Sequence, residues 1–270
     1  MLFVDLEIAR RIEHADAAGA KASAKVYAGS PAGGGAATLD VGGGVAVFAG
    51  VDSPITQVLA LGMNGPVTAN ELDELETFYR SRGSAVFVEL SPFADPTVLA
   101  LFNERGYRVV EFSSVLIRSV QASDAEWNSP VTVQVRIPRG DEVPRWSHTV
   151  ASGFFEDAEI APGIVEVLES YAGTSSMTAL LVEVEGVTAG GGALSRHQGV
   201  AWLAGQSTLP AMRKRGVQAA LIGKSLAIAA DSGCTLAIAA TLPGSVSQRN
   251  FERQGFAVAY TRCKMGRSWQ

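Results

Sequence analysis

The stretch TLPAMRKRGVQAALI, residues 208–222, decides the fold of this chain. An apolar strand leads into it, Pro210 ends that strand because proline cannot donate to a ladder, and an alanine-rich helix begins after Gly216. The first N–H groups of a helix lack partners within it and carry the positive end of its dipole, so they bind anions. The basic run at residues 213–215 adds charge. The loop therefore predicts a phosphate site, and a solvated basic helix start is the alternative.

The elements around this loop predict an α+β fold. A strand at residues 131–138 is followed by helical stretches around residues 145–155 and 162–171. Three strands with short turns between them then form an antiparallel meander. The helix that follows is apolar nearly all round, which predicts that it is sandwiched between layers. The ranges are 178–185, 188–196 and 200–209 for the meander, 217–231 for the helix and 234–241 for the next strand.

The first half of the chain repeats this order. A capping box formed by Thr68 and Glu71 predicts the start of a helix that runs to Gly83, before the buried strand AVFVEL. Both halves then carry a short helix and a matching turn, FNERGY at residues 102–107 and FERQGF at residues 251–256. We therefore predict two related domains, residues 1–125 and 126–270, joined near residues 123–128.

The composition of the chain limits the kinds of partner that we expect. The chain has 270 residues, 47% of them apolar, and a net charge of −5, so it can fill proper cores but offers no basic face for nucleic acid. No apolar stretch is long enough to span a bilayer, and the start is too charged for a signal peptide, so we expect a cytoplasmic protein without membrane or nucleic-acid partners. Cys234 and Cys263 lack CxxC spacing, which argues against a disulfide framework and a metal site.

Residues 208–222 resemble motif A of the GNAT superfamily of acyl-CoA-dependent N-acyltransferases, whose signature is Gln/Arg-x-x-Gly-x-Gly/Ala. Arg213 and Gly216 match it, and Gln218 departs at the last position. The run SQRNFERQGF at residues 247–256 resembles the superfamily's last helix and the turn into its final strand. The resemblance covers about residues 131–265. It implies a tandem protein of two GNAT-like domains, each with a mixed, mostly antiparallel sheet flanked by helices.

The resemblance further implies that acetyl-CoA is the co-substrate. The backbone near Thr208 and Leu209 would pair with the pantetheine arm, and the loop after them would wrap the pyrophosphate. The first half reads LGMNGPVT at residues 61–68, without a basic residue, so we expect no acetyl-CoA there. The residues that the resemblance assigns to the cofactor are Thr208, Leu209, Arg213, Lys214, Arg215, Gly216, Val217, Gln218, Ala219 and Asn250.

The superfamily's usual reaction is direct attack of an amine on the thioester, which requires a base, an oxyanion donor and an acid. The N–H near Leu209 is the expected oxyanion donor. Phe251 stands where the superfamily often has a tyrosine that serves as the general acid. Either the CoA thiolate therefore leaves unassisted, or another group such as Tyr260 supplies the proton. Glu156, beside Asp157, is the candidate base or amine ligand, and a solvated loop charge is the alternative reading.

Other side chains carry weaker signals. Glu183 and Glu185 alternate on a strand and fit either a cleft or a wet sheet face, while His14, His148 and His197 are isolated in the sequence. We expect the aromatic residues Phe154, Phe155 and Trp202 in the core.

Three functions stay open at this stage. The first is an active acetyltransferase that acts on an amine of a small molecule or peptide. The second is a non-catalytic acetyl-CoA sensor or regulatory module, and the third is a scaffold that binds no cofactor, against which the loop at residues 213–218 argues. The sequence leaves the oligomeric state open, a homodimer included.

Overall fold

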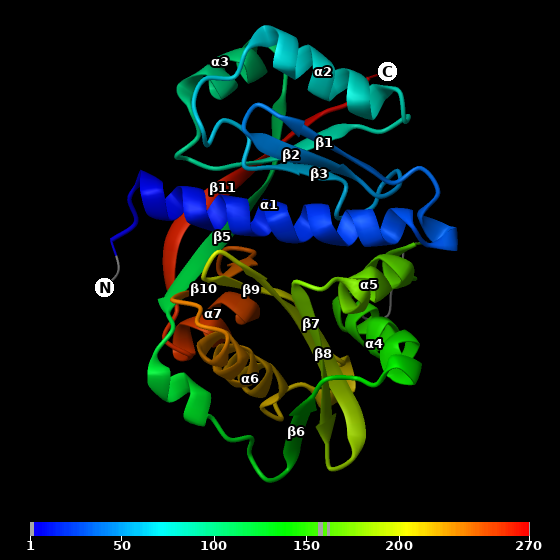
Figure 1. Cartoon of the computed structure of the whole chain (residues 1–270), viewed down its shortest axis with the longest axis vertical. Coiled ribbons are helices and arrows are strands. Elements are labelled where there is room, and N and C mark those ends of the chain that lie inside the picture. The colour runs from blue at the N-terminus through cyan, green and yellow to red at the C-terminus, as the bar shows by residue number, and fades with distance from the viewer. Residues whose placement is uncertain (1–2, 156–158, 161–162, 270) are drawn as a thin grey trace.

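The computed structural model describes every residue except 1–2, 156–158, 161–162 and 270. Helices and strands are distributed along the whole described chain (Figure 1). The α-helices are α1 (Leu6–Ala28), α2 (Ala69–Arg80), α3 (Pro96–Arg105), α4 (Val143–Phe155), α5 (Ile164–Gly173), α6 (Val217–Asp231) and α7 (Val246–Arg253). Short 3-10 helices are η1 (Pro31–Gly33), η2 (Ala122–Glu126), η3 (Gly140–Glu142) and η4 (Pro210–Met212). The strands are β1 (Ala37–Val41), β2 (Gly44–Phe48), β3 (Gln57–Leu59), β4 (Val86–Leu90), β5 (Arg108–Ser119), β6 (Val133–Arg136), β7 (Met177–Val184), β8 (Val187–His197), β9 (Val200–Thr208), β10 (Leu236–Thr241) and β11 (Ala257–Arg267).

The eleven described strands form one mixed sheet in the order β1-β2-β3-β4-β11-β5-β10-β9-β8-β7-β6. Neighbours are antiparallel except for the parallel pairs β3–β4 and β9–β10. The α+β class is therefore confirmed, and so is the β7–β8–β9 meander. The two expected sheets are continuous with one another.

The halves are joined by an exchange of their last strands. β11, which ends the second half, pairs with β4 and β5 of the first half, and β5 pairs with β10 of the second half. In Figure 1 β11 accordingly runs in red from the lower half into the upper one. Both strands follow the matching turns that the sequence repeats, and the glycines of these turns, Gly106 and Gly255, both have positive φ angles of 74° and 83°.

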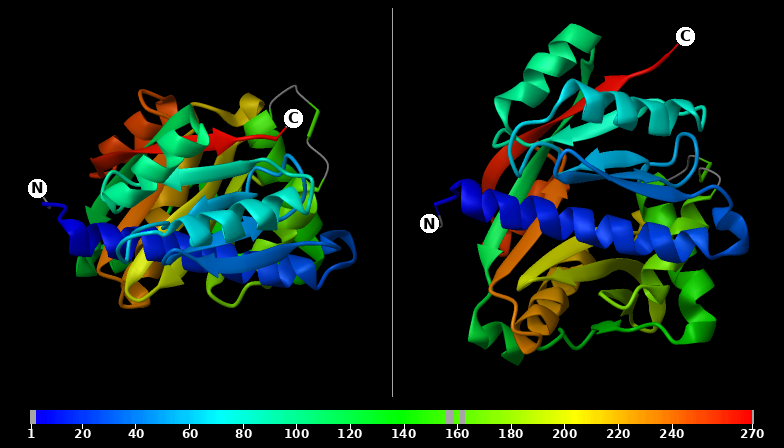
Figure 2. Two further views of the ribbon diagram at one scale, coloured as in Figure 1. Left: turned by 90° about the horizontal axis from the view of Figure 1, so that it is seen from above. Right: turned by 45° about the horizontal axis from the view of Figure 1, so that its top comes forward.

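Helices cover both faces of the sheet. Neighbouring residues of β5 show this division: Val115 packs in the cluster with α1, whereas Leu116 packs in the cluster with α6 and α7. α4 and α5 lie on the α1 side, next to α1, while α2 and α3 cover the first half on the other side. Figure 2 shows α1 crossing the strands between the two halves. No helix in the described part of the chain is long and apolar enough to cross a membrane.

The glycine run of β8 is explained by close packing. A Cβ at Gly190 would lie 2.5 Å from the Ser207 carbonyl oxygen and 2.9 Å from a methyl group of Val217. The register between β8 and β9 also shifts between Gly191 and Ala193, which marks a β-bulge. These glycines therefore let α6 begin directly against the end of β9.

Candidate active site

The sheet opens between β9 and β10. Their parallel pairing ends at the register pair of Trp202 and Ile238, and beyond this pair β9 continues along β8 while β10 continues along β5. Two parallel strands that separate in this way leave backbone groups of both strands without a ladder partner across the gap. A chain-like ligand with amide groups can occupy such a gap.

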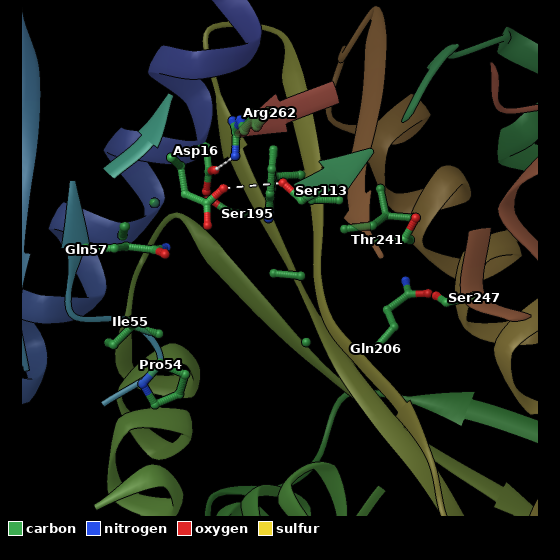
Figure 3. A pocket seen from close by; sticks show the side chains of 18 of the residues that line it. Asp16, Pro54, Ile55, Gln57, Ser113, Ser195, Gln206, Thr241, Ser247 and Arg262 are labelled. Carbon is green, nitrogen blue, oxygen red and sulfur yellow. Dashed lines mark hydrogen bonds and ion pairs between the residues drawn. The ribbon is translucent and has the colours of Figure 1, made fainter. Parts of the chain in front are cut away.

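A cavity of about 630 Å³ passes through this opening. On the α7 side it is lined by Ser247 and Phe251, and on the α1 side by Asp16 and Tyr171 (Figure 3). Both strands of the opening contribute as well, through residues 202–206 of β9 and residues 240–241 of β10. The cavity therefore connects the two faces of the sheet and offers room for two reactants that enter from opposite sides.

Several buried polar atoms on the cavity wall lack hydrogen-bond partners among the described residues. They are Oε1 of Gln206, Oγ1 of Thr241 and Oγ of Ser195. A buried polar group without a partner costs about 1–3 kcal/mol, so three of them around one cavity indicate groups that meet a ligand.

The N-terminus of α6 is linked to the cavity wall, because Gln218 in its first turn donates to Oγ of Ser247, which lines the cavity. Among the described residues no side chain caps it, and its first intrahelical bond runs from the Ala220 N–H to the Gly216 carbonyl oxygen at 3.0 Å. The N–H groups of residues 217–219, which precede that bond, are thus the expected anion donors. Gly216 has a φ of 79° and is exposed, as are Arg213, Lys214 and Arg215. The start of α6 therefore combines an uncapped helix end with three exposed basic side chains.

Gln218 and Asn250, two of the expected cofactor residues, lie together. The Gln218 side chain donates to Oγ of Ser247 at 2.9 Å and accepts from Nδ2 of Asn250 at 2.7 Å. These bonds connect the first turn of α6 to α7. Gln218, at which the sequence departs from the family signature, therefore fixes α7 against the loop.

The corresponding loop of the first half is closed by the protein's own groups. Thr68 and Glu71 cap α2: the Glu71 carboxylate accepts from the Thr68 N–H at 2.8 Å, and these hydrogen bonds lower the pKa of Glu71. The N–H groups of Gly62 and Val67 are also bonded, to the Gly42 carbonyl oxygen and to Oγ1 of Thr97. A carboxylate thus stands at the helix end where a phosphate would have to bind.

The structure limits two expectations about the chemistry. The Leu209 N–H donates to the Ala189 carbonyl oxygen at 3.0 Å, so an oxyanion donor near Leu209 would have to be another N–H group of this region. The Tyr260 hydroxyl lies outside the cavity lining and donates to Glu13 at 2.7 Å. Burial raises the pKa of Tyr260 far above its ordinary value, so it is no substitute acid. Phe251 does line the cavity, packed edge-on against Phe256.

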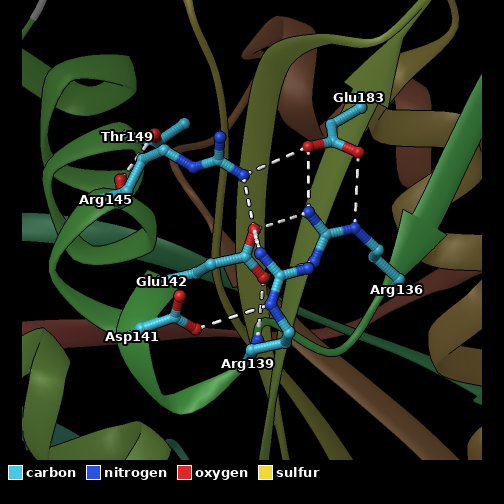
Figure 4. A network of polar contacts seen from close by, with 7 residues as sticks. All are labelled: Arg136, Arg139, Asp141, Glu142, Arg145, Thr149 and Glu183. Carbon is cyan, nitrogen blue, oxygen red and sulfur yellow. Dashed lines mark hydrogen bonds and ion pairs between the residues drawn. The ribbon is translucent and has the colours of Figure 1, made fainter.

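The candidate base Glu156, with Asp157, lies outside the described residues. Glu183 does not face the cavity: it pairs with Arg136 at 2.9 Å and with Arg145 at 3.1 Å (Figure 4). In the same network the guanidinium of Arg136 and the Arg139 N–H lower the pKa of Glu142 to about 2. This cluster therefore holds β6, β7 and the start of α4 together.

The remaining weak signals lie away from the cavity. Glu185 is exposed and pairs with Arg215 at 3.5 Å. None of the three histidines lines the cavity, and His14 makes a 3.0 Å hydrogen bond with Asn64. No group of three His, Cys, Asp or Glu side chains that could hold a metal ion occurs in the described part of the chain.

Of the three aromatic residues expected in the core, Phe154 lies outside it, whereas Trp202 packs against a core cluster and also lines the cavity. Phe154 is 56% exposed and lines it, and Trp202 lines it beneath the Arg262 guanidinium, whose carbon lies 5.4 Å from the ring centroid. Phe155 packs against the α4–α5 cluster, as expected. The partly exposed Trp202 therefore lines the cavity at the point where β9 and β10 separate.

Asp16 and Arg262 are cavity residues that the sequence does not reveal. They are 246 positions apart, on α1 and β11, and Nη1 of Arg262 donates to Oδ2 of Asp16 at 2.8 Å. The sequence analysis predicts no helix at α1, although Asp5 caps it through a 2.9 Å bond from the Ile8 N–H and alanine is frequent within it. An N-cap residue before an alanine-rich stretch was the available signal.

Comparison with known proteins identifies the second half. Residues 144–256 match the family model described as "Acetyltransferase (GNAT) family". This segment is a GNAT-family domain. No curated protein matches the chain. The GNAT segment contains β9, the phosphate loop, α6, β10 and α7, and so includes most of the elements that surround the opening in the sheet.

Solved GNAT structures are similar in fold to this chain over nearly all or about three quarters of its length. A GCN5-related N-acetyltransferase from Kribbella flavida is 19% identical and has a TM-score of 0.66, with 97% of this chain and 96% of that one covered. A GCN5-related N-acetyltransferase from Sphaerobacter thermophilus is 15% identical, with a TM-score of 0.54 and coverages of 73% and 66%. A tandem GNAT protein from the clavulanic acid biosynthesis pathway is 13% identical, with a TM-score of 0.53 and coverages of 73% and 68%. At these identities the likeness concerns the fold, tandem form included.

Proposed function

We propose that this protein transfers an acetyl group from acetyl-CoA to an amine, and that the transfer takes place where β9 and β10 separate. The observation that carries this proposal is that the cavity passes through the opening in the sheet and is linked to the uncapped N-terminus of α6, because Gln218 of α6 donates to Ser247, which lines the cavity. Acyl transfer from acetyl-CoA is the activity for which the matched family is named.

In this proposal the pyrophosphate of acetyl-CoA lies on the N–H groups of residues 217–219, with Arg213, Lys214 and Arg215 around it. The pantetheine arm follows the free edge of β9 near Thr208. Asn250 acts by orienting Gln218, to which it donates, and through it α7. Oε1 of Gln206 and Oγ1 of Thr241, both buried without partners in the described structure, fit the amide groups and the thioester end of such an arm.

We further propose that the two halves divide the work, with residues 1–125 as a domain that binds no acetyl-CoA and residues 126–270 as the cofactor domain. The capping carboxylate of Glu71 supports this division, since it occupies the helix end where the first half would need an anion site. The exchanged strands β5 and β11 then fix the first half as a wall of the cavity.

Chemically, the amine attacks the thioester directly. Phe251 leaves the usual acid position without a donor, so the thiolate departs unassisted, which a thiol pKa of about 8.5 allows. A phenylalanine at the position of the general acid also favours a second candidate function, a module that binds acetyl-CoA without turnover.

The two functions are separated by one pair of measurements. Isothermal titration of acetyl-CoA first establishes binding, and a free-thiol release assay over a panel of small-molecule and peptide amines then detects turnover. Binding with amine-dependent thiol release supports the acetyltransferase. Binding without release for any amine favours the sensor, and no binding refutes both.

A further inference from the structure

The α1 side of the cavity is built for a positively charged reactant. Its lining includes three carboxylates from three elements, Asp16 of α1, Glu89 of β4 and Glu111 of β5. All three elements belong to the first half of the chain. This wall of the cavity therefore lies outside the segment that matches the GNAT family. The charges on it need a separate explanation.

Arg262 does not neutralise this wall. Its guanidinium is 2% exposed and is shared by two carboxylates: Nη2 lies 2.9 Å from Glu13, and Nη1 lies 2.8 Å from Asp16. Glu89 pairs with Lys264 at 3.2 Å, and Glu111 is exposed. One cation for Glu13 and Asp16 leaves one negative charge in excess, and the Asp16 side chain retains 13% exposure. The other titratable groups that face Asp16 are the hydroxyls of Tyr171 and Tyr260.

The protonation of Asp16 is balanced near neutrality. Burial raises its pKa from 3.8 to about 6, against the lowering effect of Arg262, while the charges of Glu13 and Glu89 add to the rise. Asp16 is therefore a carboxylate at pH 7 that can accept a proton, and it becomes neutral as the pH falls below about 6.

A second, independent feature stands next to Asp16. Oγ of Ser195 is buried without a hydrogen-bond partner among the described residues, and Ser195 is only 2% exposed. It lies against Gly19, one turn of α1 after Asp16, because a Cβ built at Gly19 would be 2.7 Å from Oγ. Ser195 and Asp16 both line the cavity, and both are labelled in Figure 3. An ammonium group has three donors and can satisfy both side chains.

We infer that Asp16 and Ser195 bind the ammonium group of a small primary amine, and that Asp16 takes its proton. This inference rests on the proposed function. The proton moves from the ammonium nitrogen to a carboxylate oxygen of Asp16, and the freed lone pair attacks the acetyl carbonyl carbon. The carbon–sulfur bond then breaks, and the second proton of the nitrogen ends on the leaving thiolate. Asp16 returns its proton to water.

The size of the cavity fits a small acceptor. About 630 Å³ must hold both the acetyl end of the donor and the amine, and drug-sized ligands fill cavities of roughly 300–1,000 Å³. Glu111, which is exposed, remains for a second polar or cationic group of the same molecule.

The test uses two CoA thioethers, S-(2-aminoethyl)-CoA and neutral S-propyl-CoA, which differ only in that an ammonium group replaces the terminal methyl group, three bonds from the sulfur. Isothermal titration at pH 7.5 should show that wild type prefers the aminoethyl compound at least tenfold. D16N should bind S-propyl-CoA normally and lose the preference. D40N, whose carboxylate pairs with Lys21 and lies outside the cavity lining, should keep it. In wild type the preference should fall as the pH drops through about 6.

The outcomes are distinct. If D16N keeps the preference, or if wild type has none while it binds S-propyl-CoA, the assignment of Asp16 is overturned and the proposed function stands. If wild type binds neither compound, the proposed function itself fails. Normal binding of S-propyl-CoA by D16N also shows that this variant is folded.

Discussion

The substitution Gly216→Asp places a carboxylate where the pyrophosphate is proposed to lie. The position has a φ of 79° and open space around its Cβ, so the new side chain meets no clash. It removes access to the N–H groups of residues 217–219. If two charge-assisted hydrogen bonds of about 1.5 kcal/mol each are lost, the binding free energy of acetyl-CoA weakens by about 3 kcal/mol. That corresponds to an increase of roughly 100-fold in the Kd for acetyl-CoA, before charge repulsion is added.

Gly83→Asp is the matched control, because Gly83 has a φ of 67°, equally open space and a place after α2 in the first half. Both variants should lose about 1 kcal/mol of unfolding free energy from the left-handed backbone. Only Gly216→Asp should lose acetyl-CoA affinity in isothermal titration. A Kd within twofold of wild type for Gly216→Asp, or equal loss in the control, would refute the placement of the pyrophosphate.

Three further predictions concern the frame of the site. Gly190→Ala should lower the unfolding free energy by about 1–3 kcal/mol in urea and weaken acetyl-CoA binding, because its Cβ meets β9 and α6; unchanged stability would contradict the packing. Arg262→Met should cost about 3–5 kcal/mol in urea, since it leaves Glu13 and Asp16 without their cation, and a loss below 1 kcal/mol would show that the pair is solvated. Because the pKa of Glu142 is lowered from 4.5 to about 2, its carboxylate contributes to the unfolding free energy fully above pH 4.5, and this contribution is lost as the pH falls through about 2. Between these pH values the unfolding free energy of Glu142→Gln should therefore depend less steeply on pH than that of wild type.

Local signals predicted individual elements in both halves. The helix expected at residues 217–231 is α6, and the predicted capping box of Thr68 and Glu71 does cap α2. Both features depend on residues a few positions apart, since caps, glycine turns and apolar periodicity act within one element. The proposal of a phosphate loop at residues 213–218 rests on the same kind of local signal.

The pairing of the last strands could not be predicted. β5 and β11 follow matching turns, and each carries apolar residues that fit a sheet in either half. Which neighbour a strand takes depends on tertiary packing and not on its own residues. Local repetition therefore predicts two domains, each with its own last strand, whereas β11 pairs inside the sheet of the first half.

The acceptor wall was invisible for a related reason. Asp16 becomes informative only beside Arg262, which is 246 positions away and whose charge is shared with Glu13. In the sequence Asp16 is one carboxylate in an alanine-rich stretch. The Leu209 N–H illustrates the opposite case, since its place at the end of β9 was predictable but its bond to Ala189 was not.

The most direct test of the central claim is a crystal structure of the protein with CoA. The account predicts one CoA per chain, with its pyrophosphate on the N–H groups at the start of α6 and its pantetheine arm between β9 and β10, beyond the pair of Trp202 and Ile238. CoA bound beside α2, or anywhere that leaves the opening between β9 and β10 unused, would contradict it.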